Sequence, residues 1–260
     1  MNISHVMDKG SIVITGTSRG IGYHLALRFL SEGYGVIGVS RTPSPIVNDK
    51  YSDFNVDISS VSDVSALADQ LSGRGIVGLI NNAGIHGPVG PFEDVSIDAW
   101  VQALNVNLIG AVTMSKVCLP FIRESHGFII FLSGGGSAFP RPNYSAYGVS
   151  KCGVIRLAEV MAKELSPTVS VYCIAPGPNR TELLVETVQN GEIVREEDIV
   201  DFSDPEDLCL FLAQNKDPRY SGKFIHVRDN YHAWGDAELS DPSYTLRRID
   251  PRTLSQVQSL

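Results

Sequence analysis

Short runs of β-branched and apolar residues alternate with longer stretches of helical periodicity along most of this chain. The short runs predict seven strands, at residues 11–15, 35–40, 54–57, 77–80, 128–132, 169–174 and 223–227. The stretches between them predict helices at residues 21–30, 61–71, 97–123, 144–165 and 205–213. Strands that alternate with helices pair in parallel, and a parallel sheet is covered by helices on both faces. The alternation therefore predicts a doubly wound α/β fold.

Two of the predicted helices begin with capping residues. Ser60 precedes the helix at 61–71 and has Asp63 three positions on, which is typical of a helix start. Asp204 precedes Pro205, and proline is favourable at the first position of a helix, where a backbone amide would have no intrahelical acceptor. Both features support the division into elements.

The 260 residues contain no internal repeat and no long linker rich in Pro, Gly or Ser. We therefore expect a single domain spanning residues 1–260. Two regions depart from the alternation: residues 181–203, which are rich in Glu and Asp, and the tail, residues 229–260. Both are candidates for substrate specificity or assembly.

Composition excludes several classes of protein. Hydrophobic residues make up 43% of the sequence, which is enough for a full core. A net charge of −8 argues against a general nucleic-acid surface, because such a surface needs clustered Lys and Arg. No uninterrupted apolar run approaches a membrane span, and residues 1–9 lack the pattern of a secretion signal. We expect a cytoplasmic protein that binds neither nucleic acid nor membrane.

The metal-binding residue types are scattered. The four cysteines share no Cys-x-x-Cys spacing, and the six histidines form no His-x-x-x-His or Cys/His cluster. We therefore predict no metal site, and we expect Cys118, Cys152, Cys173 and Cys209 to be reduced packing residues.

A glycine-rich turn directly follows the first predicted strand and opens the first predicted helix. It reads Thr-Gly-Thr-Ser-Arg-Gly-Ile-Gly over residues 15–22. Glycine permits a tight turn and a close approach of the backbone to a pyrophosphate, and the helix amino terminus offers free amides and a positive dipole end. A flexible turn that happens to contain glycines is the alternative, but strand, turn and helix together favour a dinucleotide site.

Two arginines indicate which dinucleotide is bound. Arg41 follows the second strand, at the point where a site for NAD offers Asp or Glu to the ribose hydroxyls. An arginine there can instead bind a 2′-phosphate through a forked, charge-assisted contact, and Arg19 lies in the glycine turn. We therefore expect NADP(H) in preference to NAD(H). The alternative is that both arginines are solvated surface residues.

Tyr147 and Lys151 stand one helical turn apart in the predicted helix at 144–165. Positions i and i+4 share a helix face, so the ammonium can lie near the phenol. A neighbouring cation favours phenolate and lowers the phenol pKa from about 10 toward the working pH, as a general acid/base requires. Tyr144 is the weaker candidate, because the residue four positions on is Gly148.

Five motifs occur in one order along the chain: Thr15-Gly-x-x-x-Gly-x-Gly22, Asn81-Asn-Ala-Gly84, Asn107, Tyr147-x-x-x-Lys151 and Pro176-Gly-Pro-Asn-Arg-Thr181. Through this combination the chain resembles the short, single-domain branch of the short-chain dehydrogenase/reductase family, over about residues 10–228. The resemblance implies a seven-stranded Rossmann-type sheet with a nicotinamide dinucleotide across the carboxyl ends of its strands. It also implies a homodimer or homotetramer.

The resemblance assigns roles to single residues as well. Asn107 matches the family's helix asparagine, whose local kink holds a water near the catalytic lysine; Asn105 is the weaker candidate. Lys151 is expected both to assist Tyr147 and to hold the nicotinamide ribose. The residues expected to bind the cofactor are Gly16, Ser18, Arg19, Gly20, Ile21, Gly22, Arg41, Asp57, Ile58, Asn82, Ala83, Gly84, Tyr147, Lys151, Pro176, Gly177 and Thr181.

The serine that binds the substrate oxygen in the resembled family usually lies thirteen residues before the tyrosine. That position here is Gly134. Ser133 is one residue earlier, and a bulge in the three following glycines would bring it to the expected place. We therefore expect Ser133 to be the catalytic serine, with Ser137, or no serine, as the alternatives.

Together these residues predict an NADP(H)-dependent oxidoreductase that transfers a hydride between the nicotinamide and a small carbonyl or secondary alcohol substrate. Tyr147 would act as the general acid/base with the help of Lys151. One alternative is a catalytically silent dinucleotide-binding sensor or scaffold subunit, since fold does not determine function. Another is a sugar-nucleotide epimerase or dehydratase, which commonly needs a larger carboxyl-terminal domain.

Overall fold

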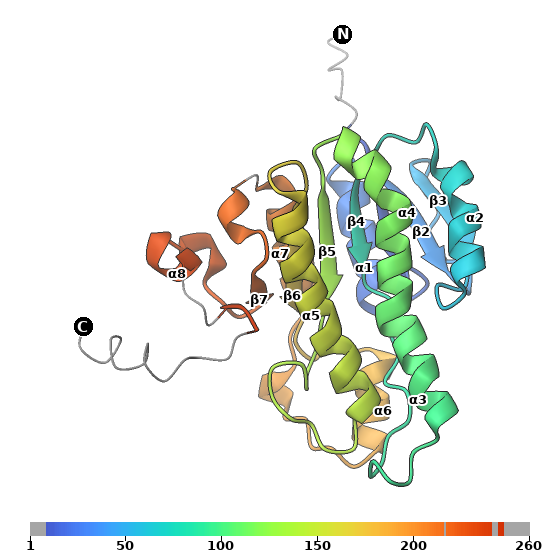
Figure 1. Cartoon of the computed structure of the whole chain (residues 1–260), viewed down its shortest axis with the longest axis vertical. Helices are drawn as coiled ribbons and strands as arrows, with labels where there is room; N and C mark the ends of the chain where they lie inside the picture. The colour runs from blue at the N-terminus through green and yellow to red at the C-terminus, as the bar shows by residue number, and fades with distance from the viewer. Residues whose placement is uncertain (1–8, 216, 241–243, 247–260) are drawn as a thin grey trace.

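Seven parallel strands form the central sheet of the protein (Figure 1). The computed structural model describes residues 9–215, 217–240 and 244–246. The strand order is β3-β2-β1-β4-β5-β6-β7, and every pairing is parallel. The strands are β1 (Ser11–Thr15), β2 (Gly35–Ser40), β3 (Tyr51–Asn55), β4 (Ile76–Asn81), β5 (Phe128–Leu132), β6 (Ser170–Ala175) and β7 (Phe224–His226). The predicted doubly wound fold with seven parallel strands is confirmed.

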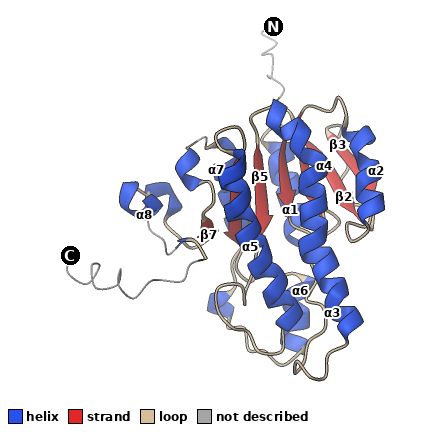
Figure 2. Ribbon diagram, in the orientation of Figure 1, coloured by secondary structure: helices blue, strands red, loops and turns tan. Residues whose placement is uncertain are grey.

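Helices cover both faces of the sheet, as Figure 2 shows. One face carries α2 (Val61–Leu71), α4 (Gly110–Glu124) and α5 (Ser145–Leu165), and the other carries α1 (Gly20–Ser31) and α7 (Ser203–Gln214). Neighbouring strand residues point to opposite faces, so Val13 joins one apolar core whereas Ile12 and Ile14 join the other. The inner strands β1, β2, β4, β5 and β6 are buried on both sides and are apolar runs without alternation, whereas the edge strand β3 is polar and partly exposed.

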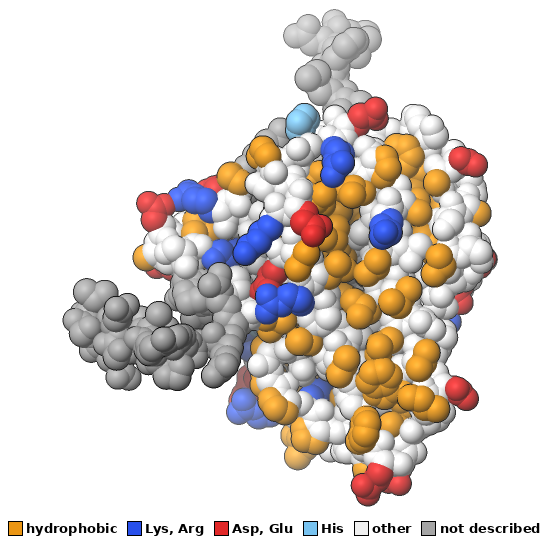
Figure 3. Space-filling view, in the orientation of Figure 1, with side chains coloured by type: hydrophobic (Ala, Val, Ile, Leu, Met, Phe, Trp, Pro, Cys, Tyr) orange, Lys and Arg blue, Asp and Glu red, His pale blue; other side chains and the backbone are white. Residues whose placement is uncertain are grey.

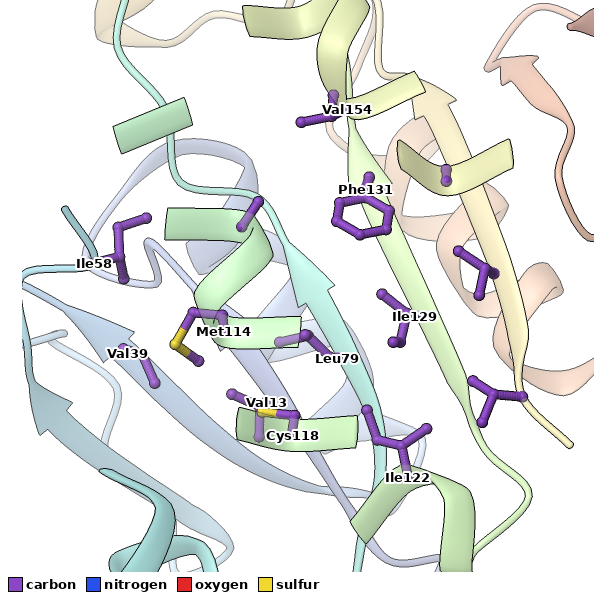
Figure 4. Close-up of a cluster of buried hydrophobic side chains, with 14 of the residues drawn as sticks. Val13, Val39, Ile58, Leu79, Met114, Cys118, Ile122, Ile129, Phe131 and Val154 are labelled. Atoms are coloured by element: carbon purple, nitrogen blue, oxygen red, sulfur yellow. The ribbon is translucent and has the colours of Figure 1, made fainter. Parts of the chain in front are cut away.

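The core beneath α4 shows how the helix face is used (Figure 4). Met114, Cys118 and Ile122 are spaced by four residues on α4, and all three are completely buried against the sheet. Cys118, Cys173 and Cys209 are buried and Cys152 is partly buried, and all four are free thiols. Within the described ranges, no cluster of His, Cys, Asp and Glu side chains could hold a metal ion.

The helix predicted at 97–123 is interrupted by one wide turn. It consists of α3 (Ile97–Leu104), a π-helical segment (Asn105–Ile109) and α4, and the Gly110 amide bonds to the Asn105 carbonyl. An 18-residue window within Ile97–Glu124 has a mean hydropathy of 1.3, so this helix is long and apolar enough for a membrane span, but half of that window is buried inside the protein. Buried core helices have the same length and composition, so this helix by itself does not indicate a membrane span.

Most boundaries lie within two residues of the prediction, and the largest difference is at the third strand. The third strand begins at Tyr51 and ends at Asn55, because Asn55 pairs with Ser40, the last residue of β2. Helix α2 does begin after Ser60, whose side chain accepts the Asp63 amide. Helix α7 begins at Ser203, so Asp204 lies in the first turn and not at the cap. Pro205 is still tolerated there, because amides of the first turn have no intrahelical acceptor.

The acidic region contains a helix that the sequence did not indicate. Helix α6 (Glu182–Gln189) begins after Thr181, whose hydroxyl accepts the Leu184 amide. A 3₁₀ turn (Glu196–Asp198) follows before α7. Helix α6 lies at the end of the sheet toward which the arrow of β5 points (Figure 1).

Part of the tail packs on the domain. After the 3₁₀ turns Pro218–Tyr220 and Tyr231–Ala233 comes a short helix, α8 (Asp236–Ser240). Trp234 stacks on Tyr220 with ring centroids 5.8 Å apart, and Tyr231 is buried. The predicted extension was residues 229–260, of which 241–243 and 247–260 lie outside the described residues.

Candidate active site

A cavity of about 420 Å³ lies at the carboxyl ends of the strands. Parallel strands bring the residues that follow them to one edge of the sheet, where ligands bind in open α/β folds. The predicted site residues that line this cavity are Gly16, Ser18, Arg19, Gly20, Ile21, Arg41, Asp57, Ile58, Asn82, Ala83, Gly84, Ser133, Tyr147, Lys151, Pro176 and Thr181. The motifs far apart in the sequence therefore meet in one place.

Three predicted residues do not line the cavity but support it. A Cβ at Gly22 would lie 2.1 Å from the Gly16 carbonyl oxygen, so this glycine lets α1 approach the turn closely. Gly177 has a φ of +67° and permits the turn after β6. The third is Asn107, which lies in the π-helical segment behind the cavity.

The glycine turn is tied to the end of β4. Gly16 has a φ of +76°, a conformation that favours glycine. The Asn82 side chain donates to the Thr15 carbonyl at 2.8 Å, and the Thr15 hydroxyl accepts the amides of Asn82 and Ala83, both at 3.0 Å. These bonds fix the glycine turn beside the end of β4, at the rim of the cavity.

The two arginines at the adenine end differ in their surroundings. Arg41 is exposed, and no ion pair is formed by its guanidinium in the described part of the chain. Arg19 Nε lies 2.9 Å from a carboxylate oxygen of Glu182 in α6, with both side chains more than half exposed. Arg19 therefore links the glycine turn to α6, whereas the guanidinium of Arg41 is free to bind an anionic ligand.

Asn107 holds the segment after β4 against α5. Its Oδ1 accepts the Ile85 amide at 2.8 Å, and its Nδ2 donates to the Ile85 carbonyl at 2.8 Å and to Ser150 Oγ at 3.0 Å. A Cβ at Gly84 would lie 3.2 Å from both Asn107 Oδ1 and Lys151 Nζ, so the asparagine and the lysine meet at this glycine. Asn107 lies within the π-helical segment, where the resemblance led us to expect a local kink of the helix.

Tyr147 and Lys151 are both buried, with 8% and 5% of their surface exposed. Lys151 Nζ donates to the Leu132 carbonyl at 2.9 Å and lies 5.7 Å from the centre of the Tyr147 ring. Burial lowers the pKa of Lys151 to about 8, because the ammonium has lost its water.

Burial also raises the pKa of Tyr147 to about 12, and the positive charge of Arg141 opposes that rise. The sequence led us to expect a lowered pKa with Lys151 as its cause. The structure differs, because desolvation of the phenolate outweighs the attraction of a lysine that is turned toward a backbone carbonyl.

The serines near Tyr147 hydrogen-bond to the backbone. Ser133 Oγ donates to the Lys151 carbonyl at 3.0 Å, and Ser137 Oγ donates to the Gly134 carbonyl at 2.7 Å. Gly134 itself faces the phenol, since a Cβ there would lie 2.3 Å from the Tyr147 hydroxyl oxygen. Ser133 lines the cavity, and its amide donates to the Ile174 carbonyl at 2.8 Å.

Four residues around Tyr147 are not among the site residues expected from the sequence. The ring of buried His86 lies edge-on to Tyr147, with centroids 5.1 Å apart, and its Nδ1 is 3.2 Å from Glu186 Oε2. Arg141 binds Glu192 with its Nε 2.9 Å and 3.2 Å from the two carboxylate oxygens. Both carboxylates belong to the acidic region 181–203, whose charge was the only signal in the sequence.

The chain is similar to known oxidoreductases. Residues 11–192 match the family described as short chain dehydrogenase. An uncharacterized oxidoreductase of Schizosaccharomyces pombe, C162.03, is 34% identical over 187 residues, covering 69% of this chain and 64% of that protein. The chain thus spans less than two thirds of that relative. The benzil reductase ((S)-benzoin forming) IRC24 of Saccharomyces cerevisiae is 32% identical over 190 residues, covering 66% of this chain and 72% of that protein.

Solved structures agree with the sequence relatives. The 3-ketoacyl-(acyl-carrier-protein) reductase from Brucella melitensis, complexed with NADH, has a TM-score of 0.77 at 25% identity, covering 85% of this chain and 97% of that one. The family match extends over more than half of the chain. The chain therefore belongs to the short-chain dehydrogenase/reductase family, whose members are oxidoreductases that bind NAD(H) or NADP(H).

Proposed function

We propose that the protein is an NADP(H)-dependent oxidoreductase that interconverts a small carbonyl compound and the corresponding secondary alcohol. One observation carries the proposal: a buried Tyr147–Lys151 pair borders the same cavity as the glycine turn and the exposed Arg41. The proton-transferring tyrosine and the bound dinucleotide would thus lie in one cavity. The similarity to a benzil reductase supports a ketone substrate.

The residues present fit a dinucleotide. Because Gly22 has no side chain, the glycine turn packs closely on the start of α1, whose free amides can bind a pyrophosphate. Asn82, Ala83 and Gly84 line the same cavity. When bound, the nicotinamide supplies or accepts the hydride.

The proton transfer is assigned to Tyr147. In reduction its phenolic O–H bond breaks and the proton passes to the substrate oxygen, where negative charge develops; in oxidation the phenolate takes the proton back. Lys151 Nζ, held by the Leu132 carbonyl, supplies a positive group close to that charge in its protonated form.

Arg41→Ala is expected to raise the Kd of NADPH by about 10- to 100-fold, because a charge-assisted contact to the 2′-phosphate is lost. The Kd of NADH, which lacks that phosphate, should stay unchanged and is the internal control. Fluorescence titration with both cofactors measures the two constants without any substrate. An unaltered ratio of the two constants would remove Arg41 from the assignment.

A catalytically silent dinucleotide-binding subunit is the second candidate. It is favoured by the phenol pKa of about 12 and by Gly134, which faces the phenol while the hydroxyls of Ser133 and Ser137 donate to backbone carbonyls. A panel of ketones that includes benzil separates the two candidates: NADPH oxidation with any of them supports the enzyme, and NADPH binding without turnover supports the silent subunit.

We also propose that copies of the chain associate as a homodimer or homotetramer. Apolar side chains gather on the face shown in Figure 3, where Figure 1 places α3, α4 and α5. The exposed apolar residues of α3, the π-helical segment and α5 include Val101, Ile109, Val149 and Val160, each 39–51% exposed. Burial of this face in an interface would remove them from water. Light scattering should therefore give a molar mass of two or four chains. Val149→Glu should reduce this mass, because it places a charge in the interface. A monomeric unsubstituted protein would contradict the proposal.

A further inference from the structure

Arg141 is a mostly buried cation close to Tyr147 to which the proposed mechanism assigns no role. It lies in the loop between β5 and α5, six residues before Tyr147, and its side chain is only 16% exposed. Its guanidinium carbon lies 3.7 Å above the Tyr144 ring and 6.0 Å from the centre of the Tyr147 ring. Arginine keeps its charge when buried, so this is a permanent cation beside the phenol.

The acidic region fixes Arg141 in this place. Its Nη2 donates to Glu192 at 2.9 Å and to the Thr187 hydroxyl at 3.3 Å, in addition to the two contacts that Nε makes with Glu192. A two-pronged ion pair combined with stacking on an aromatic ring leaves the guanidinium few other orientations. The segment after β6 thus sets the position of a charge in the segment before α5.

The other groups around the phenol are less able to supply positive charge. Lys151 bonds to a backbone carbonyl, and burial brings its pKa to about 8. The pKa of His86 is lowered by burial and by Arg141, against the attraction of Glu186 and Glu192. Above neutral pH, Arg141 is therefore the cation near Tyr147 that stays fully charged.

We propose that Arg141 is a positioning residue for the reaction: held by Glu192, its guanidinium stabilises the phenolate form of Tyr147. The inference rests on the proposed function, because the phenolate matters only if Tyr147 exchanges protons with a substrate. It is consistent with the direction in which Arg141 acts on the phenol, namely to lower a pKa that burial raises.

The test compares Arg141→Met, which keeps the length of the stem and removes the charge, with Arg141→Lys, which keeps the charge. The probe is the secondary alcohol corresponding to whichever ketone of the panel is reduced fastest, with kcat/KM for its oxidation measured from pH 6 to 10. Loss of the cation should make the phenolate harder to form. The rising limb of the profile should then move to higher pH by about one unit in Arg141→Met, a roughly tenfold loss at any pH on that limb, and by less in Arg141→Lys.

The matched control is Arg195→Met. Arg195 belongs to the same acidic region and pairs with Asp198 at 2.9 Å, but its side chain is 65% exposed. Its profile should coincide with that of the unsubstituted protein. If Arg141→Met does not fold, Arg141→Gln takes its place, and the melting temperature of each variant checks its fold.

A substrate-free measurement shows whether the charge has been removed from the site. NMR titration of His86, assigned by its loss in His86→Gln, should give a higher pKa in Arg141→Met, because the nearby cation disfavours the imidazolium. A raised His86 pKa with an unshifted oxidation profile would overturn the inference and leave the proposed function intact. No turnover by the unsubstituted protein would overturn both.

Discussion

Tyr147→Phe is expected to lower kcat for ketone reduction by about 10²- to 10⁴-fold, the range that a positioned general acid contributes. The substitution removes the proton that passes to the substrate oxygen and leaves the ring in place. Because the Tyr147 hydroxyl makes no hydrogen bond to another described residue, its loss should leave the fold unaltered. The Kd of NADPH should therefore change by no more than about threefold.

The chain offers a matched control in Tyr144. Its hydroxyl is buried without a hydrogen-bond partner among the residues described, and its ring lies 5.3 Å from that of His86, as the ring of Tyr147 lies 5.1 Å from it. Tyr144→Phe removes the same atom from a neighbouring ring that does not line the cavity, and it should retain turnover. Rates of NADPH oxidation and fluorescence titrations measure both variants. Equal turnover by the two variants would show that Tyr147 is not the acid.

Gly134→Ala is expected to lower turnover by about 10²-fold, although it adds only one methyl group. The new Cβ would lie 2.3 Å from the Tyr147 hydroxyl oxygen and 3.2 Å from Cζ, which forces the phenol to move. Tyr147 is 8% exposed and packs edge-on against His86, so its ring cannot move toward His86 without displacing that side chain. Misplacement of a reacting group by about 1 Å can reduce the rate by about this factor.

Gly135→Ala is the control for this substitution. A Cβ at Gly135 meets no atom within 4 Å, so the variant changes the flexibility of the same loop without touching the phenol. Its turnover and melting temperature should stay near those of the unsubstituted protein. Steady-state rates that are equal in the two glycine variants would show that Gly134 does not set the position of the phenol.

Periodicity and motif order predicted the fold and the contents of the cavity. A parallel sheet brings the residues after its strands to one edge, so Arg41, Asn82 and Ser133 could be placed at one site from their positions after predicted strands. Strand ends were less predictable. The third strand ends with Asn55 because its partner ends at Ser40, and this pairing is not a property of the strand's own residues.

Electrostatics was the part of the site that local sequence predicted least well. Four-residue spacing correctly put Tyr147 and Lys151 on one helix face, but the balance between desolvation and attraction depends on what surrounds that face. The Leu132 carbonyl, from a strand nineteen residues earlier, takes the ammonium of Lys151. Arg141 and Glu192 meet from segments 51 residues apart in the chain.

By itself, the sequence determined the class of fold, the edge of the sheet where the motif residues meet, and the placement of Tyr147 and Lys151 on one helix face, because these follow from helical and strand periodicity and from short spacings. Only the tertiary structure decided that Gly134 faces the phenol, that Ser133 turns to the Lys151 carbonyl, and that Arg141 is the permanent cation beside Tyr147. Those features depend on contacts between distant segments and on burial, which sequence spacing does not encode.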